Sequence, residues 1–222
     1  FFHFLKKYIK SNQIIIIRSS VYPGICETIY QILKSKNKNL SYCPERIIQG
    51  KSIIELPKLP QIVSGFNNTA ISNSANLFKK ISKKIIYTKV IEAELIKLFS
   101  NAYRYIHFSI ANQFYKICED LNLDFNSIRK NMVDGYNRNK DIPKQGFTAG
   151  PCLLKDTMQL ASFCKNNFEL GYAAMNINEN LPIYLLKNVK NFHKMKIGIL
   201  GLAFKAGTDD IRDSLSIKLI QF

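Results

Sequence analysis

The stretch from Ile91 to Leu121, IEAELIKLFSNAYRYIHFSIANQFYKICEDL, decides the fold. Its apolar residues return at steps of three or four, which is the spacing of one face of an α-helix. The stripe consists of Leu95, Phe99, Ala102, Ile106, Ile110, Phe114, Ile117 and Leu121. At about 1.5 Å per residue, such a helix would be about 45 Å long, enough to cross a domain and reach a second subunit. The sequence therefore predicts one long helix with a continuous apolar stripe.

The residues before this helix alternate between strand and helix patterns. Short apolar runs predict strands, and helical spacing predicts helices between them. The expected strands are Gln13–Arg18, Leu40–Cys43, Gln61–Ser64 and Lys84–Thr88, and the expected helices are Cys26–Lys34 and Thr69–Lys80. This order is typical of the later βα units of a doubly wound domain, so we expect an α/β fold with a partial Rossmann-like parallel sheet.

The residues after the long helix stay helical to about position 192, and Met195–Leu200 then has the pattern of another strand. We therefore expect three parts: the later βα units of a doubly wound domain at residues 1–66, a helical central domain at 67–192, and the start of another domain at 193–222. The sequence contains no Gly-x-Gly-x-x-Gly, the turn that brings a dinucleotide pyrophosphate onto a helix N-terminus. Both ends of the chain look cut, and we expect it to continue beyond them.

One cysteine stands in a context that favours chemistry. In Gly150-Pro151-Cys152-Leu153-Leu154-Lys155-Asp156, helical spacing begins at Leu153, and Pro151 fits the first turn, where its missing N–H costs nothing. The unpaired N–H groups of a helix N-terminus favour a thiolate, and a nearby lysine adds to the effect. Cys152 is therefore a candidate nucleophile, against the plainer interpretation of a small buried core residue.

Composition narrows the classes of function. With 46% hydrophobic residues in 222, the chain can bury a core, and no apolar run is long enough for a membrane span, so we expect a cytoplasmic protein. Five cysteines without Cys-x-x-Cys spacing suggest neither a disulfide framework nor a zinc site. The net charge of +16 would suit nucleic acid, but the lysines are scattered and no nucleic-acid-binding signature accompanies them. A basic balance equally suits phosphorylated ligands.

Five blocks, in order, resemble the UDP-glucose/GDP-mannose dehydrogenase family of nucleotide-sugar 6-dehydrogenases. They are Arg18–Gly24, Cys43–Gly50, Glu92–Asn101, Gly150–Asp156, and Gly198–Ser214 with its Ala203-Phe204-Lys205 and Thr208-Asp209-Asp210-Ile211-Arg212. The resemblance implies NAD as cofactor, a UDP-sugar as substrate, and a four-electron oxidation of the sugar C6 alcohol to the acid. It implies that the parts on either side of the central domain are an NAD-binding domain, at residues 1–66, and the start of a second Rossmann-like, UDP-sugar-binding domain, at 193–222. It also implies a homodimer formed through the long helix, with no nucleic acid or membrane partner. The Cys43-Pro44-Glu45-Arg46-Ile47 pattern leans toward members that act on UDP-N-acetylhexosamines.

The resemblance also implies roles for individual residues. Cys152 would form a thiohemiacetal and then a thioester, and Asp156 would orient or deprotonate the hydrolytic water. Lys97 and Asn101 would stabilise the oxyanion at C6, and Glu45 would act as an acid–base or water-positioning group. Ser20, Gln49, Lys155 and Arg212 match cofactor-contacting positions; Ala149 and Lys205, with Glu45, Lys97 and Asn101, match the sugar-nucleotide site.

Plainer interpretations stay open beside these roles. Asp156 could be a first-turn acid favoured by the helix dipole, Lys97 a solvated lysine, and Glu45 a surface carboxylate paired with Arg46. Two other functions also remain. A 6-phosphogluconate or 3-hydroxyacid type of dehydrogenase can share the Lys97-x-x-x-Asn101 pattern but works without a cysteine, and the chain could instead be a non-catalytic basic dimerisation or nucleic-acid-binding fragment.

Overall fold

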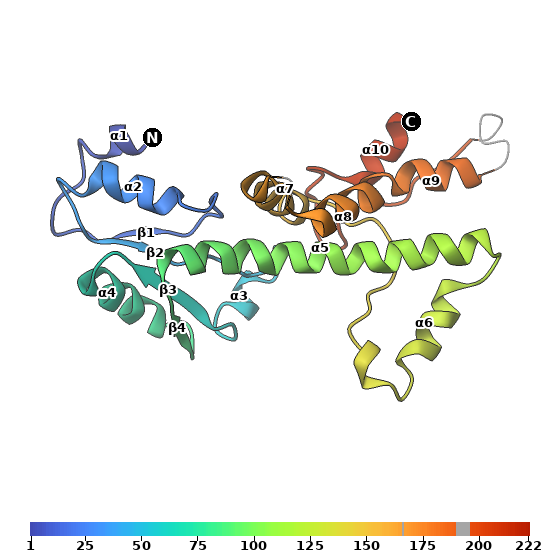
Figure 1. The fold of residues 1–222 in the computed structure, drawn as a ribbon, viewed down its shortest axis with the longest axis horizontal. Helices are drawn as coiled ribbons and strands as arrows, with labels where there is room; N and C mark the ends of the chain where they lie inside the picture. Colours follow the sequence, from blue (N-terminus) through green and yellow to red (C-terminus); the bar gives the residue numbers. More distant parts are fainter. Residues whose placement is uncertain (166, 190–195) are drawn as a thin grey trace. The chain divides into compact units, whose positions relative to one another are not determined.

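The computed structural model describes residues 1–165, 167–189 and 196–222, and the chain divides into two compact units, Phe1–Phe99 and Ser100–Phe222. The long helix α5 spans Val90–Asp120 and contributes to both units (Figure 1). The prediction of Ile91–Leu121 agrees with the observed bounds to within one residue at each end. The agreement is close because the apolar periodicity of this segment is long and unbroken.

The first unit contains a four-stranded sheet in the order β1 (Ile15–Ile17), β2 (Leu40–Tyr42), β3 (Gln61–Gly65) and β4 (Ile85–Tyr87). The pairs β1–β2 and β3–β4 are parallel, whereas β2 and β3 are antiparallel. The expected sheet was parallel throughout. The link from β2 to β3 carries only the one-turn helix α3 (Ser52–Glu55), and without a full crossover helix the chain returns in the opposite direction.

Helices cover both faces of this sheet. Figure 1 shows α2 (Ile25–Leu33) and α4 (Asn68–Lys79) on opposite sides of the strands, and the short α1 (Phe2–Leu5) lies beside α2. On one side, Ile29 and Leu33 of α2 pack with Leu40; on the other, Phe78 of α4 packs with Val63. The arrangement confirms the predicted α/β class with a Rossmann-like first part.

A buried carboxylate fastens α5 to the start of α2. Glu94 is 1% exposed, and its two oxygens accept the backbone N–H groups of Gly24 at 2.7 Å and Cys26 at 2.9 Å. Gly24 is the N-cap residue of α2 with φ +90°, a conformation that favours glycine. The negative charge therefore satisfies N–H groups that the first turn of α2 leaves unpaired.

Replacing this carboxylate with an amide, Glu94→Gln, is expected to destabilise the chain by about 2 kcal/mol, because the amide NH₂ cannot accept a hydrogen bond from a second N–H. Urea unfolding followed by circular dichroism measures the change. Glu27→Gln is the matched control: Glu27 is exposed in the same first turn, and its carboxylate contacts the Gln31 side chain. Equal stability of the two variants would contradict the capping role of Glu94.

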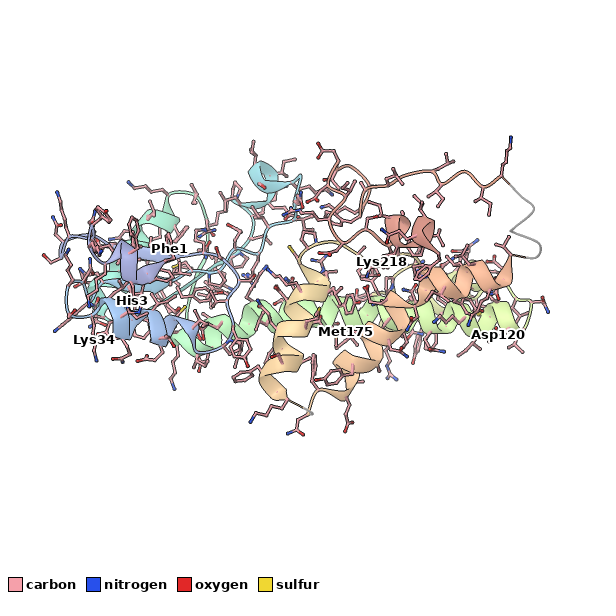
Figure 2. The ribbon with its side chains drawn as sticks, turned by 90° about the horizontal axis from the view of Figure 1, so that it is seen from above. Phe1, His3, Lys34, Asp120, Met175 and Lys218 are labelled. Carbon is pink, nitrogen blue, oxygen red and sulfur yellow. The ribbon has the colours of Figure 1, made fainter. Side chains whose placement is uncertain are left out.

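The second unit is helical. After the second part of α5 come α6 (Phe125–Val133), the 3₁₀ turn η1 (Asn137–Asn139), α7 (Leu153–Cys164), α8 (Glu169–Glu179), α9 (Leu181–Asn188) and α10 (Leu215–Gln221). Figure 2 shows α9 running along α5 toward Asp120, and the Tyr184 hydroxyl donates to Lys116 O at 3.2 Å. Lys218 of α10, labelled in Figure 2, pairs with Glu179, which also accepts from the buried Tyr105 hydroxyl at 3.1 Å.

The buried face of α5 differs from the predicted apolar stripe. Leu98, Ala102 and Tyr105 are buried there, together with the polar residues Glu94, Asn101, Ser109 and Asn112. Five members of the predicted stripe are exposed instead: Phe99, Ile110, Phe114, Ile117 and Leu121. The long helix thus carries two different faces, a mixed face toward its own chain and an apolar stripe that the chain leaves uncovered.

Near the C-terminal end one prediction is wrong. Residues 196–200 of the expected strand Met195–Leu200 form no strand, and Met195 lies outside the described residues. A strand needs a neighbour for its backbone hydrogen bonds, and Leu200 is fully exposed here. The predicted division at positions 66 and 192 stays a prediction, and its second boundary also lies outside the described residues. None of the helices in the described ranges is long and apolar enough to cross a membrane.

Candidate active site

Cys152 is an exposed thiol at the start of a helix. It is the N-cap residue of α7, and its carbonyl accepts the Asp156 N–H at 2.9 Å. The prediction of a helix start is confirmed, but Pro151 lies before the helix rather than in its first turn. Burial raises the pKa of Cys43 to about 11 and that of Cys26 further, with Glu94 adding to the effect at Cys26. Those two core thiols are poor nucleophiles by comparison.

The loop before Cys152 is anchored by a fully buried amide. Asn112 of α5 donates to Gly146 O at 3.0 Å and accepts from Gly146 N at 2.8 Å, so its side chain pairs with both polar groups of one residue. The same Nδ2 donates to Asn178 Oδ1 of α8 at 2.9 Å. The approach to the nucleophile is therefore fixed to two helices.

The structure brings together two of the predicted catalytic residues in the second unit. Asn101 of α5 donates through Nδ2 to Asp156 Oδ2 at 2.6 Å, and both residues are buried. The other carboxylate oxygen of Asp156 lies 3.6 Å from the Nζ of Lys155, whose side chain is half exposed. Asp156 is thus a buried carboxylate held by one amide and one cation, one helical turn beyond the thiol.

Lys97 precedes Asn101 by one helical turn on α5, so the two side chains leave the helix on the same side. Lys97 is half-buried rather than fully solvated. It also lies one turn after the carboxylate cap Glu94, so three polar side chains follow one another along this part of the helix.

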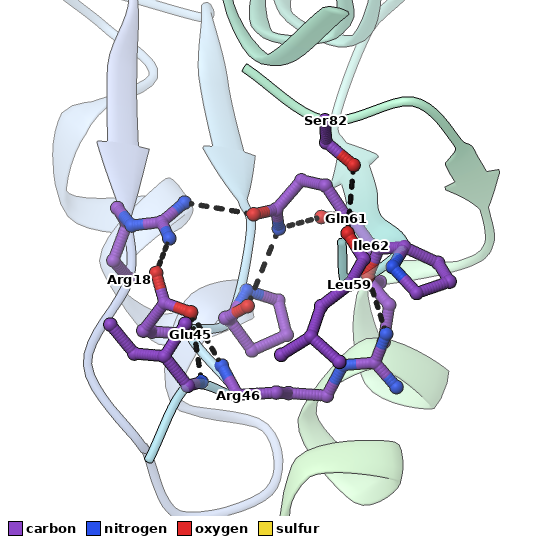
Figure 3. Close-up of polar contacts among 10 residues, drawn as sticks. Arg18, Glu45, Arg46, Leu59, Gln61, Ile62 and Ser82 are labelled. Atoms are coloured by element: carbon purple, nitrogen blue, oxygen red, sulfur yellow. Dashed lines mark hydrogen bonds and ion pairs between the residues drawn. The ribbon is translucent and has the colours of Figure 1, made fainter. Parts of the chain in front are cut away.

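Glu45 lies in a polar cluster in the first unit (Figure 3). Its carboxylate pairs with the guanidinium of Arg18 and accepts the backbone N–H groups of Arg46 at 2.8 Å and Ile47 at 3.1 Å. The plainer alternative, a pair with the Arg46 side chain, is not what the structure shows, because the Arg46 guanidinium donates to Pro60 O. Arg18 also donates to Gln61 Oε1 at 3.3 Å. Nothing in the sequence pattern indicated that Arg18 would pair with Glu45 or that Gln61 would bind the same guanidinium.

Two predicted cofactor residues follow the carboxyl ends of neighbouring parallel strands. Ser20 follows β1 and Gln49 follows β2, after the block that begins at Cys43. This edge is where doubly wound sheets bind their ligands. The roles of Ser20 and Gln49 in cofactor binding stay predictions, and the glycine-rich turn typical of a pyrophosphate site does not occur in this sequence.

The remaining predicted residues lie around the Cys152 loop and in the segment after Gly201. Ala149 precedes Gly150 in the loop, and Lys205 and Arg212 lie in the later segment. The Arg212 guanidinium is bidentate on Asp210, with Nη2–Oδ2 at 2.6 Å and Nε–Oδ1 at 3.0 Å. Asp210 was not singled out from the sequence, although its position two residues before Arg212 in a matching block was a usable signal.

Comparison with known families assigns two successive stretches of the chain to two domains of one class of NAD-dependent dehydrogenase. Residues 2–86 match the NAD-binding domain of the UDP-glucose/GDP-mannose dehydrogenase family, and residues 91–180 match its central domain. The chain belongs to the UDP-glucose/GDP-mannose dehydrogenase family. NAD is the cofactor that the family's N-terminal domain binds.

Individual relatives agree with this assignment. UDP-N-acetyl-D-mannosamine dehydrogenase from Methanocaldococcus jannaschii is 29% identical over 222 residues, which cover 97% of this chain and 51% of the relative. UDP-glucose 6-dehydrogenase from Rickettsia bellii is also 29% identical, over 96% of this chain and 53% of the relative. The structure of UDP-D-ManNAc dehydrogenase from Pyrococcus horikoshii matches with a TM-score of 0.89 at 26% identity, over 99% of this chain and 56% of that one. The chain thus spans about half the length of the relatives that it matches.

Proposed function

We propose that the protein carrying this sequence oxidises a UDP-sugar at C6 to the uronic acid in two steps, through a covalent intermediate on Cys152. The observation that carries the proposal is the exposed thiol at the N-cap of α7, one turn before a buried Asp156 that is hydrogen-bonded to Asn101. Rossmann-type dehydrogenases that oxidise an alcohol only to a carbonyl compound have no need of such a thiol.

The thiol accounts for the second half of the oxidation. Sγ of Cys152 adds to the C6 carbon of the aldehyde, and the aldehyde oxygen takes a proton to give a thiohemiacetal. Two molecules of NAD, bound one after the other, would supply the two hydride acceptors, one for the C6 alcohol and one for the thiohemiacetal, and each oxidation also releases one proton. Water then attacks the resulting thioester and releases the acid and the free thiol, so the nucleophile is regenerated.

The neighbouring polar residues stabilise the oxygen at C6 as its charge changes. Lys97 and Asn101 leave α5 on the same side, and one N–H of the Asn101 amide is fixed by Asp156. The amide is therefore pre-oriented, so its second N–H can be directed at an oxyanion without reorganisation at the moment of reaction. Asp156 has the role of orienting or deprotonating the hydrolytic water, and Glu45 serves as a further acid–base or water-positioning group.

Binding roles complete the proposal. Ser20, Gln49, Lys155 and Arg212 contact the cofactor, and Ala149 and Lys205 contact the sugar nucleotide, as the family resemblance implies. The relatives named above favour UDP-N-acetyl-D-mannosamine as the sugar nucleotide, with UDP-glucose as the alternative. A cytoplasmic location stays a prediction.

The partner in the proposed assembly is a second copy of the chain. The exposed stripe of Phe99, Ile110, Phe114 and Ile117 on α5, with Leu121 directly after it, gives the long helix an apolar face for dimerisation. Light scattering tests this directly, with Phe114→Lys and Ile117→Lys as the disrupting pair.

Product stoichiometry tests the reaction. We expect two NADH formed per UDP-sugar consumed, with the uronic acid as the released product and UDP-N-acetyl-D-mannosamine turned over faster than UDP-glucose. One NADH per sugar, with a ketone or free aldehyde as the final product, would instead indicate a two-electron dehydrogenase and would contradict the proposed role of Cys152.

A further inference from the structure

The segment after Gly201 packs directly on the loop that carries Cys152. Gly150 has φ +101°, and a Cβ built on it would lie 2.3 Å from a ring carbon of Phe204. The phenyl ring therefore occupies the space that a side chain at position 150 would need. The Gly150 N–H also donates to Asp213 O at 3.3 Å. Both contacts are therefore made at Gly150, two residues before Cys152 in the sequence.

The same segment holds Arg212 in a defined orientation. Asp210 accepts the Phe204 N–H through its backbone oxygen at 3.0 Å, while its carboxylate forms the bidentate pair with Arg212. Arg212 is otherwise exposed, and an exposed arginine loses conformational entropy when it is ordered. The contact of Phe204 with Gly150 thus fixes, through Asp210, where the guanidinium lies.

Arg212 directly precedes Asp213, whose backbone oxygen accepts the Gly150 N–H at 3.3 Å, so this part of the segment lies against the loop that carries Cys152. The pKa of Arg212 is raised above its ordinary value, first by its hydrogen bonds and charge interaction with Asp210, and to a smaller extent by Cys152 and Asp213. A cation beside a cysteine stabilises the thiolate, which is the reactive form.

We propose that Phe204 is a positioning residue that, by packing on Gly150, holds Arg212 beside the sulfur of Cys152. The nucleophile then receives its positive surroundings from a segment about fifty residues further along the chain, in addition to the N-terminus of α7. The inference rests on the proposed function for the identity of the nucleophile, but the charge around Cys152 is measurable without turnover.

The test compares two alkylating reagents on the full chain. Iodoacetate is anionic and iodoacetamide is neutral, so the ratio of their rates at one cysteine reports the local charge. Peptide mass spectrometry reads Cys152 and, as internal control, Cys164 at the other end of α7. We expect a higher ratio at Cys152 than at Cys164, and a fall at Cys152 alone of about threefold or more in Arg212→Gln, as for one unit charge screened by water and salt.

Phe204→Ala removes no charge, yet it should lower the ratio at Cys152 as Arg212→Gln does, and the double variant should fall no further. Gly150→Ala, which places a methyl group where the ring lies, should have the same effect and serves as a second route if Phe204→Ala unfolds. Unfolding would be recognised by alkylation of the buried Cys26 and Cys43. A normal ratio in folded Phe204→Ala or Gly150→Ala, or in Arg212→Gln, overturns the inference.

The proposed function can fail separately from this inference. If Cys152→Ser leaves acid formation intact while the ratios respond as described, the nucleophile assignment fails and the positioning role stands. If Cys152→Ser is inactive but the alkylation ratios do not respond, the positioning role of Phe204 fails and the assignment of Cys152 as nucleophile stands.

Discussion

Cys152→Ser is expected to reduce formation of the uronic acid by at least about 10³-fold, because a serine hydroxyl without its own general base is a far weaker nucleophile than a thiolate. The first hydride transfer does not require the thiol, so the variant should still form aldehyde. Rapid-quench sampling with separate measurement of NADH, aldehyde and acid distinguishes the two stages. The expected result is a single early NADH per site, followed by little or no acid.

Cys164→Ser is the matched control for this experiment. Cys164 is the last residue of α7, partly exposed, and is eleven residues from the first residue of the helix, so its loss should leave the rate and the stoichiometry of two NADH unchanged. Unchanged acid formation in Cys152→Ser would exclude Cys152 as the nucleophile. A loss of activity in both variants would point to general damage to α7.

Lys97→Ala is expected to lower kcat by about 10²- to 10³-fold, or about 3 to 4 kcal/mol in transition-state stabilisation, the scale for loss of one oxyanion donor. KM for the sugar nucleotide should change much less, because the charge that the lysine opposes develops during the reaction. Steady-state kinetics with saturating NAD gives both constants.

Lys79→Ala, at an exposed position in the last turn of α4, is the control and should retain the full kcat. A Lys97→Ala enzyme with kcat within threefold of the parent would mean that Lys97 is only a solvated helix residue. A large rise in KM with kcat preserved would instead assign it to substrate binding.

The sequence was most informative where a periodic pattern was long. Helix α5 and helix α4 were predicted to within a residue at each end, since each repeats its apolar spacing over several turns. The β2–β3 pairing was missed because short apolar runs such as Leu40–Tyr42 and Gln61–Gly65 specify burial but not strand direction. Residues 196–200 have strand composition but no neighbour to pair with in the described structure.

The candidate site was predictable in its local parts and not in its long-range contacts. Cys152 and Asp156 are four residues apart, so helical spacing was enough to relate them. Nothing in the sequence showed that Asp156 would meet Asn101, 55 residues earlier, or that Phe204 would pack on Gly150. Arg46 was the partner of Glu45 only in the plainer interpretation, because the two residues are adjacent, and in the structure the Arg18 guanidinium pairs with Glu45 instead.

The cap at Glu94 sets a limit on how this family member can vary. Glu94, Lys97 and Asn101 lie within eight residues of one uninterrupted helix, and each has a partner or a proposed role on a fixed side of it. Inserting or deleting a single residue between them would rotate everything beyond that point by about 100° around the helix axis. If Glu94 kept its contacts with the start of α2, the residues beyond the change would leave the helix on a different side from Glu94 than they do now. The count of residues between positions 94 and 101 is therefore under stronger constraint than the identity of those that face outward.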